Sequence, residues 1–178
     1  MRKVKIMDKE AVMRSLARMT HEILERKDGG SLVILGVKTR GIYLSQILAQ
    51  NLKKFAGVDV PCGYIDATMY RDDFTEEQKQ QKVGESSIPC DINGKTVLIV
   101  DDVLYTGRTA RAVIEAIFDL GRPQAVCLAV LVDRGHREVP VRPDFVGKNI
   151  PTSRQEKIVV VMNDETQDEG VFIVNEQE

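Results

Sequence analysis

Short apolar runs alternate in this chain with longer segments of helical period, and this alternation restricts the possible folds more than any other feature. Three runs are almost continuously apolar and rich in β-branched residues, at 31–36, 96–100 and 124–132. A strand of this kind is typical of a parallel sheet that is covered on both faces. Between the runs, apolar residues recur at helical spacing. The sequence therefore predicts an α/β fold, with a mostly parallel central sheet flanked by helices.

The predicted helices cover 12–24, 42–55 and 110–120. The first follows Asp8, a residue type that caps helix N-termini well, and is expected to end near the Asp-Gly-Gly turn at 28–30. The start of each remaining helix directly after an apolar run is the arrangement of strand–helix–strand units.

Four further segments complete the prediction. A strand at 58–67 is interrupted by Pro61, which favours an irregular or edge position. Two last strands are expected at 157–162 and 171–174, on either side of an acidic turn. Finally, 68–89 and 133–157 follow neither the helix nor the strand period. Loops of that length inside a compact domain are usually functional.

Length and composition narrow the class of protein further. The 178 residues are 43% hydrophobic and 29% charged, which predicts a single globular domain over 1–178. The longest apolar run, 125–132, is far shorter than the roughly 20 residues of a membrane span, and Arg2-Lys3 lead into no apolar stretch. We therefore expect a cytoplasmic protein without a membrane partner. Three widely spaced Cys without a CxxC pair predict reduced thiols rather than disulfides or a zinc site.

Charge is distributed unevenly although the net charge is only −2. Residues 1–31 hold eight Lys and Arg against five acids, and 134–157 hold six against three. From 163 to the end there are six acids and no base. Two basic segments in a nearly neutral chain are compatible with a nucleic-acid surface, and equally with ordinary solvated faces.

The most informative motif follows the apolar run at 96–100. Asp101 and Asp102 come at the end of this predicted strand, and a loop with Thr106, Gly107 and Thr109 leads from them into a helix. Backbone N–H groups in such a turn and at a helix N-terminus form a phosphate cradle. Carboxylates beside it accept hydrogen bonds from sugar hydroxyls or bind a hard divalent cation. The motif therefore predicts a ligand that carries both a phosphate and a ribose diol.

Two common nucleotide-binding patterns are absent from the sequence. Residues 36–41 lack the Gly-Lys-Ser/Thr ending of a P-loop, and no G-x-G-x-x-G occurs. Neither a P-loop hydrolase nor an ordinary dinucleotide-binding fold is therefore predicted.

The chain resembles a known family over residues 8–161, and five sequence blocks carry this resemblance in the same order along the chain as in the family. The block that is most specific is given first. The blocks read Asp101-Asp-Val-Leu-Tyr-Thr-Gly-Arg-Thr109, Gly36-Val-Lys-Thr-Arg-Gly41, Tyr70-Arg-Asp-Asp73, Val132-Asp-Arg-Gly-His-Arg137 and Val146-Gly-Lys-Asn-Ile-Pro-Thr-Ser153. The first is similar to the phosphoribosyl-diphosphate signature of type I phosphoribosyltransferases. Together they resemble the PyrR family, bifunctional proteins that attenuate a pyrimidine operon through its mRNA and act as uracil phosphoribosyltransferases.

The resemblance implies roles for individual residues. It places ribose hydroxyls on Asp101 and Asp102, and the 5-phosphate on the loop 105–109. It implies that Lys38, Arg40 and Arg71 neutralise the diphosphate, with Mg²⁺ bound through the diphosphate and with Asp101 and Asp102 as candidate ligands of the ion. The remaining substrate contacts that it implies are Thr39, Gly41, Tyr70, Val103, Leu104, Tyr105, Thr106, Gly107, Arg108, Thr109, Arg134, Val146, Gly147, Lys148 and Ile150.

The resemblance also implies moving parts and a reaction. Residues 68–89 correspond to a flexible β-hairpin lid, and 133–157 to a hood over the base. Uracil would displace diphosphate from ribose C1, which develops positive charge on the sugar as in glycoside cleavage. Electrostatic preorganisation and exclusion of water would then contribute more than any single acid or base.

RNA binding is the second implied function. Arg14, Arg18 and His21 are spaced three or four residues apart and share one predicted helix face. With Arg137, Arg142 and Lys148 they form the predicted surface for a pyrimidine-operon mRNA stem-loop. The family resemblance further implies regulation by UMP or UTP and a homodimer, with a hexamer open as a larger assembly.

Two alternatives to this hypothesis remain at the sequence level. In one, the protein is an RNA-binding attenuator whose nucleotide site only senses UMP and UTP. In the other, it is a phosphoribosyltransferase that salvages purine bases. Lys38, Arg40 and Arg71 together favour retained catalysis, because a sensor needs no grip on diphosphate.

Overall fold

The structure, a computed structural model, describes residues 2–26, 31–163 and 168–175. The elements in chain order are β1 (Arg2–Asp8), α1 (Lys9–Arg26), β2 (Leu32–Val37), α2 (Arg40–Ala56), β3 (Cys62–Ile65), the 3₁₀ turn η1 (Thr68–Tyr70), α3 (Glu76–Lys82), β4 (Thr96–Leu104), α4 (Arg108–Leu120), β5 (Ala125–Asp133), β6 (Phe145–Asn149), β7 (Glu156–Val161) and β8 (Gly170–Asn175). The predicted end of the first helix at 28–30 lies outside the described residues.

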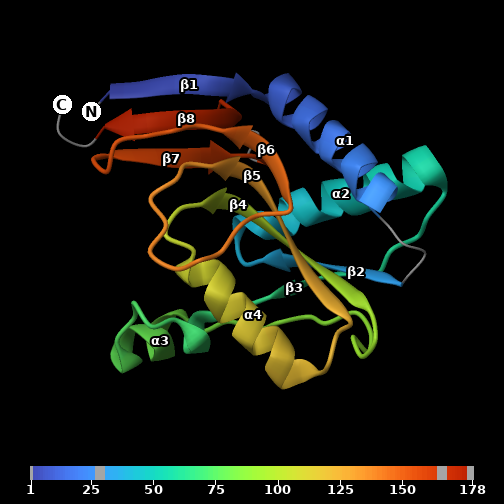
Figure 1. The fold of residues 1–178 in the computed structure, drawn as a ribbon. Helices are drawn as coiled ribbons and strands as arrows, with labels where there is room; N and C mark the ends of the chain where they lie inside the picture. The colour runs from blue at the N-terminus through green and yellow to red at the C-terminus, as the bar shows by residue number, and fades with distance from the viewer. Residues whose placement is uncertain (1, 27–30, 164–167, 176–178) are drawn as a thin grey trace.

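The central sheet contains five parallel strands in the order β3-β2-β4-β5-β6. Helices α1 and α2 cover one face and α4 covers the other (Figure 1). The chain winds from β2 outward to β3 and then returns to place β4 on the other side of β2. The carboxyl ends of β2 and β4 therefore lie at a point where the winding direction reverses, which is where open α/β sheets bind their ligands.

Alternate residues of the central strands fill two separate cores. Ile34, Leu98 and Val100 pack toward α1 and α2, whereas Leu35 and Ile99 pack toward α4. All five are at most 1% exposed. This burial on both faces explains the continuous apolar runs in the sequence and confirms the predicted α/β class.

A second, antiparallel sheet has the order β1-β8-β7 (Figure 1). Strands β7 and β8 confirm the two predicted C-terminal strands within one or two residues at each end. Strand β1 was not predicted, because its partner β8 is more than 160 residues away and local pattern carries no information about that pairing. Asp8 ends β1 and caps α1, where its Oδ1 accepts a hydrogen bond from the backbone N–H of Ala11 at 2.7 Å.

Other differences fall in the irregular segments. Strand β3 is shorter than predicted but is an edge strand, as Pro61 indicated. The expected β-hairpin at 68–89 is wrong for this structure, since η1 and α3 occupy it and one isolated bridge joins Tyr64 to Ser87. A capping box at Thr75 and Gln78 favours the helix α3 locally. The hood segment contains strand β6, which the Gly- and Pro-rich sequence did not indicate.

None of the helices in the described part of the chain has both the length and the apolar character needed to cross a membrane.

Candidate active site

Two loops meet at the carboxyl ends of β2 and β4. Residues 38–39 join β2 to α2, and 105–107 join β4 to α4. The two strands are neighbours in the sheet, and their helices begin on opposite faces of it. Because a helix N-terminus carries unsatisfied N–H groups and partial positive charge, the arrangement directs two anion-binding ends toward one place.

Gly107 allows the sharp turn by which the short β4–α4 loop leads into α4. It is the N-cap of α4 with φ of 88°, in the left-handed region that glycine adopts without strain. It is also buried beneath residues 134–144, which we call the β5–β6 insertion. A Cβ at Gly107 would lie 2.8 Å from Val139 Cγ2 of this insertion. The backbone carbonyl of Thr106 accepts hydrogen bonds from the N–H groups of Glu138 and Val139, at 2.9 and 3.2 Å. The insertion therefore fixes the back of the predicted phosphate loop.

Asp101 and Asp102 lie near the carboxyl end of β4, followed in the strand only by Val103 and Leu104. Both acids are half-buried. Each carboxylate accepts a hydrogen bond from the next backbone N–H at 2.8 Å. Desolvation, and after it the neighbouring charge of Asp102, raise the pKa of Asp101 well above the usual range of an aspartate. The charged form of Asp101 is therefore poorly stabilised by the protein itself, which is expected of a group that binds a ligand.

The start of α2 approaches β4 very closely at Gly41. A Cβ added there would lie 2.3 Å from the backbone oxygen of Val100, so only glycine allows this contact. The contact of Gly41 with substrate that the resemblance implies stays a prediction. On the β2–α2 loop Thr39 is the N-cap of α2, and the guanidinium of Arg40 lies 3.5 Å from Asp102 Oδ2. The predicted diphosphate loop and the acid pair are thus in direct contact.

Lys38 reaches toward the segment that was predicted as a lid. A Cβ at Gly84 would lie 2.3 Å from Lys38 Nζ and 2.9 Å from Asp66 Oδ2. Gly84 therefore leaves the space that the lysine ammonium occupies, between the end of this segment and the start of α2.

Arg71, at the other end of the same segment, reaches the phosphate loop. Its guanidinium hydrogen-bonds the hydroxyl of Thr109 and binds both carboxylate oxygens of Asp73, with 2.6 Å between Nε and Oδ1. This guanidinium is the main cause that lowers the pKa of Asp73. Tyr70 was predicted to contact substrate, but its hydroxyl donates to Asp119 on α4 at 2.7 Å. In this structure η1 packs against α4 and the Tyr70 hydroxyl is directed to Asp119, so the substrate contact of Tyr70 stays a prediction.

Arg108 joins three parts of the site through charges that the sequence did not identify. Its guanidinium lies 2.8 Å from Asp72 of the lid segment and 2.8 Å from Glu138 of the insertion. Glu138 and Asp73 also line the cavity described next. Their acidic character was visible in the sequence, but only the fold brings them beside a loop some 30 residues away.

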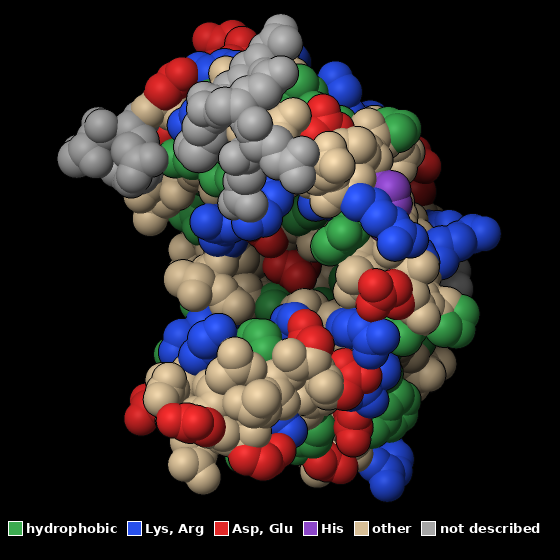
Figure 2. All heavy atoms as spheres, turned by 90° about the vertical axis from the view of Figure 1, so that its left-hand side faces the viewer, with side chains coloured by type: hydrophobic (Ala, Val, Ile, Leu, Met, Phe, Trp, Pro, Cys, Tyr) green, Lys and Arg blue, Asp and Glu red, His purple; other side chains and the backbone are tan. Residues whose placement is uncertain are grey.

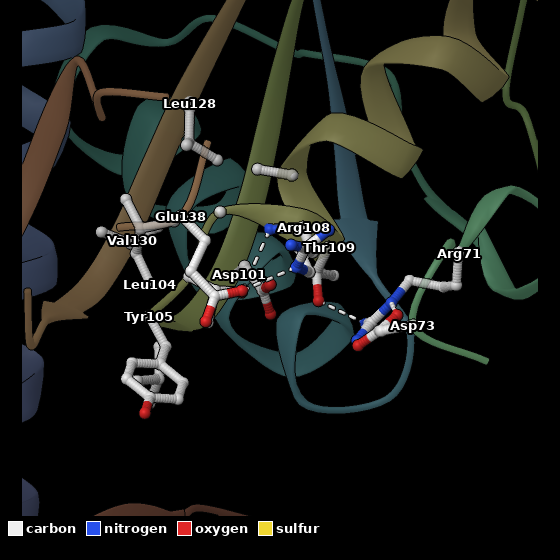
Figure 3. A pocket seen from close by; sticks show the side chains of 14 residues that line it. Arg71, Asp73, Asp101, Leu104, Tyr105, Arg108, Thr109, Leu128, Val130 and Glu138 are labelled. Carbon is white, nitrogen blue, oxygen red and sulfur yellow. Dashed lines mark hydrogen bonds and ion pairs between the residues drawn. The ribbon is translucent and has the colours of Figure 1, made fainter. Parts of the chain in front are cut away.

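A cavity of about 300 Å³ lies along the β4–α4 loop and the start of α4, and none of Lys38, Arg40 and Asp102 lines it. Figure 2 shows the hollow on this side of the molecule, with acidic side chains inside it and Lys and Arg side chains around it. Figure 3 shows Asp101 pointing into the cavity between Glu138 and Thr109, with the pair of Arg71 and Asp73 at one side. The predicted residues that line it are Arg71, Asp101, Val103, Leu104, Tyr105, Thr106, Gly107, Arg108 and Thr109; Asp73, Ala110, Leu128, Val130 and Glu138 line it as well.

The predicted contacts to the base lie elsewhere. Val146, Gly147 and Lys148 are on β6, two strands away from β4, and Ile150 is buried just after it. The backbone carbonyls of Val146 and Gly147 accept hydrogen bonds from Arg18, at 3.0 and 2.5 Å. None of these four residues lines the cavity.

The predicted RNA-binding residues differ in how far their side chains are engaged by other groups of the protein. Arg14 is exposed and lies 3.7 Å from Glu10, and Arg142 and Lys148 are exposed. His21 stacks on Phe55 with ring centroids 4.9 Å apart, and Arg18 is tied to β6.

Arg137 has a different position from the one predicted for RNA binding. It donates to the carbonyls of Tyr105 and Val141, both at 2.9 Å, and to Asp133 at 2.6 Å. Its guanidinium is therefore committed to the loop after β4, and we no longer expect it to neutralise RNA phosphates.

Side chains that could hold a metal ion are few. In the part of the chain that the structure describes, no three acids, His or Cys come together as a metal cage. The pair of Asp101 and Asp102 offers carboxylate oxygens, the ligand type of Mg²⁺. These residues fit an ion that takes most of its ligands from a bound diphosphate and water.

The site and fold together define a phosphoribosyltransferase-type domain, and comparisons agree. A family model described as the phosphoribosyl transferase domain matches residues 5–166. The hypoxanthine-guanine phosphoribosyltransferase of Bacillus anthracis has a similar structure, with a TM-score of 0.72, 20% identity and coverage of 96% of this chain and 98% of that one. At this identity the likeness concerns the fold alone.

Two curated relatives are much closer in sequence. "Bifunctional protein PyrR 1" of Lactiplantibacillus plantarum is 52% identical over 171 residues, covering 94% of this chain and 95% of the relative. "Bifunctional protein PyrR" of Listeria monocytogenes is 49% identical over 181 residues, covering 99% of both. The chain belongs to the PyrR family of phosphoribosyltransferase-fold proteins.

Proposed function

We propose that the protein is a uracil phosphoribosyltransferase that also regulates a pyrimidine operon by binding its mRNA. The observation that carries the enzymatic part is the meeting of Asp101 and Asp102 with two loops that supply positive charge and lead into the N-termini of α2 and α4. A ribose diol on the acids, with a phosphate on each side, matches the charges of the site. The membership in the PyrR family supports uracil as the base and mRNA as the partner.

The chemistry of the site is electrostatic. Loss of diphosphate from ribose C1 leaves positive charge on the sugar and negative charge on the leaving group. Lys38, Arg40 and Arg71 would stabilise the departing diphosphate, and the loop 106–109 would hold the 5-phosphate throughout. Mg²⁺, when bound with the diphosphate, would neutralise further charge. The acids Asp101 and Asp102 would orient the sugar and stabilise its developing positive charge.

The enzymatic proposal is tested by substrate choice. We expect turnover of uracil with phosphoribosyl diphosphate and Mg²⁺, and at most weak turnover of hypoxanthine or guanine. Asp102→Asn should reduce uracil turnover at least 100-fold, by analogy with the loss of a transition-state contact. Asp59→Asn, an exposed acid at the far end of α2, is the matched control. Preferred turnover of a purine base would support salvage instead, and no turnover with intact UMP binding would support a sensor.

The RNA-binding proposal rests on the exposed basic side chains Arg14, Arg142 and Lys148. Each phosphate contact should add about 0.9 to the slope of log affinity against log salt concentration, so each Ala variant should reduce that slope by about this amount. The measurement is binding of a pyrimidine-operon leader transcript at several salt concentrations, with and without UMP. Arg122→Ala, at the opposite end of α4 from the site, is the control. Unchanged slopes in all three variants would place the RNA on another surface.

The contacts of Arg18 and Arg14 guide the choice of a variant that should separate the two functions. Arg18 is a poor choice, because its guanidinium holds the carbonyls of Val146 and Gly147 and its loss would disturb β6. Arg14→Glu avoids this, since Arg14 lies at the exposed side of α1 beside Glu10. We expect Arg14→Glu to weaken RNA binding with uracil turnover retained, and Asp102→Asn to do the reverse. Loss of both functions in either variant would contradict the division of the two sites. The dimer and hexamer remain predictions, to be measured by analytical ultracentrifugation.

A further inference from the structure

Tyr105, the first residue after β4, is held from several directions by the β5–β6 insertion. The guanidinium of Arg134 lies over the Tyr105 ring, 3.9 Å from its centroid. The ring of His136 meets the same tyrosine edge-on, with 5.9 Å between centroids. Arg137 donates to the Tyr105 backbone carbonyl at 2.9 Å and is itself fixed by Asp133. We call Arg134, His136 and Arg137 the Tyr105 clamp.

Arg134 is an unusual member of this clamp, because it is only 5% exposed. Its hydrogen bonds go to neutral acceptors, the hydroxyl of Thr152 at 2.9 Å and the carbonyl of Ser153 at 3.0 Å. Burial disfavours the charged guanidinium and so lowers the pKa of Arg134. A buried guanidinium is costly unless its surroundings hold it in one orientation. The Tyr105 ring supplies part of that stabilisation, since an aromatic face attracts a desolvated cation.

His136 completes the cluster from the same segment. Its Nε2 lies 2.5 Å from the carbonyl oxygen of Thr152, the residue whose hydroxyl binds Arg134. The clamp is therefore linked to the end of the hood segment on one side and to the β4–α4 loop on the other. It connects two parts of the chain that are nearly 50 residues apart.

The clamp determines which groups of the loop remain free for a ligand. The carbonyls of Tyr105 and Thr106 are both occupied by the insertion. The loop between β4 and α4 is thereby turned so that its carbonyls face the insertion and its helix N-terminus faces the cavity. Preorganised N–H groups bind an oxyanion without paying to reorder the loop.

We propose that the Tyr105 clamp positions the phosphate loop, and that Arg134 acts through Tyr105 rather than by touching the base. The inference rests on the proposed function, because it assumes that this loop holds the 5-phosphate of phosphoribosyl diphosphate. It assigns to Arg134 the role of a positioning residue. It also gives Tyr105 a part in binding that depends on its ring.

Steady-state kinetics with Mg²⁺, uracil and phosphoribosyl diphosphate test this role. Arg134→Lys keeps the charge but loses the planar group that stacks on the ring, and Tyr105→Leu loses the aromatic face. Each should raise KM for phosphoribosyl diphosphate about tenfold, equivalent to about 1.4 kcal/mol, while KM for uracil changes less than threefold. Tyr105→Phe should recover most of the loss, since it restores the ring. Arg154→Lys, at an exposed arginine between β6 and β7, is the matched control.

The double variant distinguishes positioning from direct contact. If Arg134 acts through the ring, Arg134→Lys added to Tyr105→Leu should cost less than a further twofold. Full additivity, or a rise in KM for uracil instead of phosphoribosyl diphosphate, would overturn the proposal. Thermal unfolding confirms that each variant is folded at the assay temperature, and the Tyr105 variants decide the question if Arg134→Lys is not. A wild-type protein that binds no phosphoribosyl diphosphate would refute the proposed function, whereas wild-type kinetics in the variants would refute the clamp alone.

Discussion

Replacing Gly41 by alanine tests whether the contact between α2 and β4 sets the geometry of the site. The new Cβ would lie 2.3 Å from the backbone oxygen of Val100 and 3.3 Å from its carbon. Carbon and oxygen atoms approach to about 3.3 Å, so the start of α2 must withdraw from β4 by about 1 Å. Arg40, the neighbouring residue, would move with it and away from Asp102.

The expected cost can be estimated for stability and for activity. Overpacking of this kind costs about 1–3 kcal/mol, and a protein of this size loses about 2–4 °C of Tm for each kcal/mol. A displacement of about 1 Å of a substrate-positioning group can reduce the rate about 100-fold. We therefore expect Gly41→Ala to lower Tm by several degrees and kcat/KM for phosphoribosyl diphosphate by about two orders of magnitude.

Gly57→Ala is the matched control at the other end of α2. Gly57 has φ of 64° and no neighbouring atoms within 4 Å of an added Cβ in the described structure. Alanine there should cost about 1–2 kcal/mol through backbone strain alone, and leave kcat/KM within twofold. Differential scanning calorimetry and initial rates would measure both variants. Wild-type kcat/KM in Gly41→Ala, or an equal loss in Gly57→Ala, would refute the argument from close approach.

Three further predictions concern titrating groups. The folded protein raises the pKa of Asp101, so protein stability should fall as the pH rises from the usual aspartate pKa through the raised one. Asp101→Asn should therefore increase Tm at pH 7.5 while abolishing turnover. A lower Tm would contradict this. Arg71 lowers the pKa of Asp73, so this ion pair should stabilise the folded protein at neutral pH and lose that effect in acid. In Asp73→Asn we expect less than about 1 kcal/mol of lost stability. KM for phosphoribosyl diphosphate should fall in the same variant, because Arg71 is released for the ligand. Burial raises the pKa of Cys62 and Cys127, so both thiols should react with iodoacetamide at pH 7.5 more slowly than a free cysteine does, as followed by mass spectrometry.

The central sheet could be predicted from sequence because its strands are buried on both faces. Runs such as Val97–Val100 carry the signal in every residue, and the helices between them show a clear period. Asp101 and Asp102 could be placed at the ligand-binding edge for the same reason, since they directly follow that run. The local pattern determines both the element and its end.

The remainder depends on contacts between distant segments. Strand β1 forms only because β8 is available to pair with it, and Tyr70 faces away from the cavity because η1 packs on α4. The hydrogen bonds of Arg137 to the loop after β4 could not be predicted, because a basic residue in a basic segment looks the same in sequence whether it faces solvent or binds a loop. Charge can be counted from a sequence, but the partner of each charge comes from the fold.

The start of α2 on one face of the sheet and of α4 on the other has a consequence for ligands of different length. A molecule with an anionic group at each end would span the sheet edge and be held from both sides, whereas a nucleoside monophosphate would engage the α4 side alone. In the proposed reaction a base displaces diphosphate from ribose C1, so a molecule of the first kind and the base give one of the second kind and a separate anion. Each product then keeps half of the attachment that its parent had, so the same geometry that retains the substrate favours departure of the products.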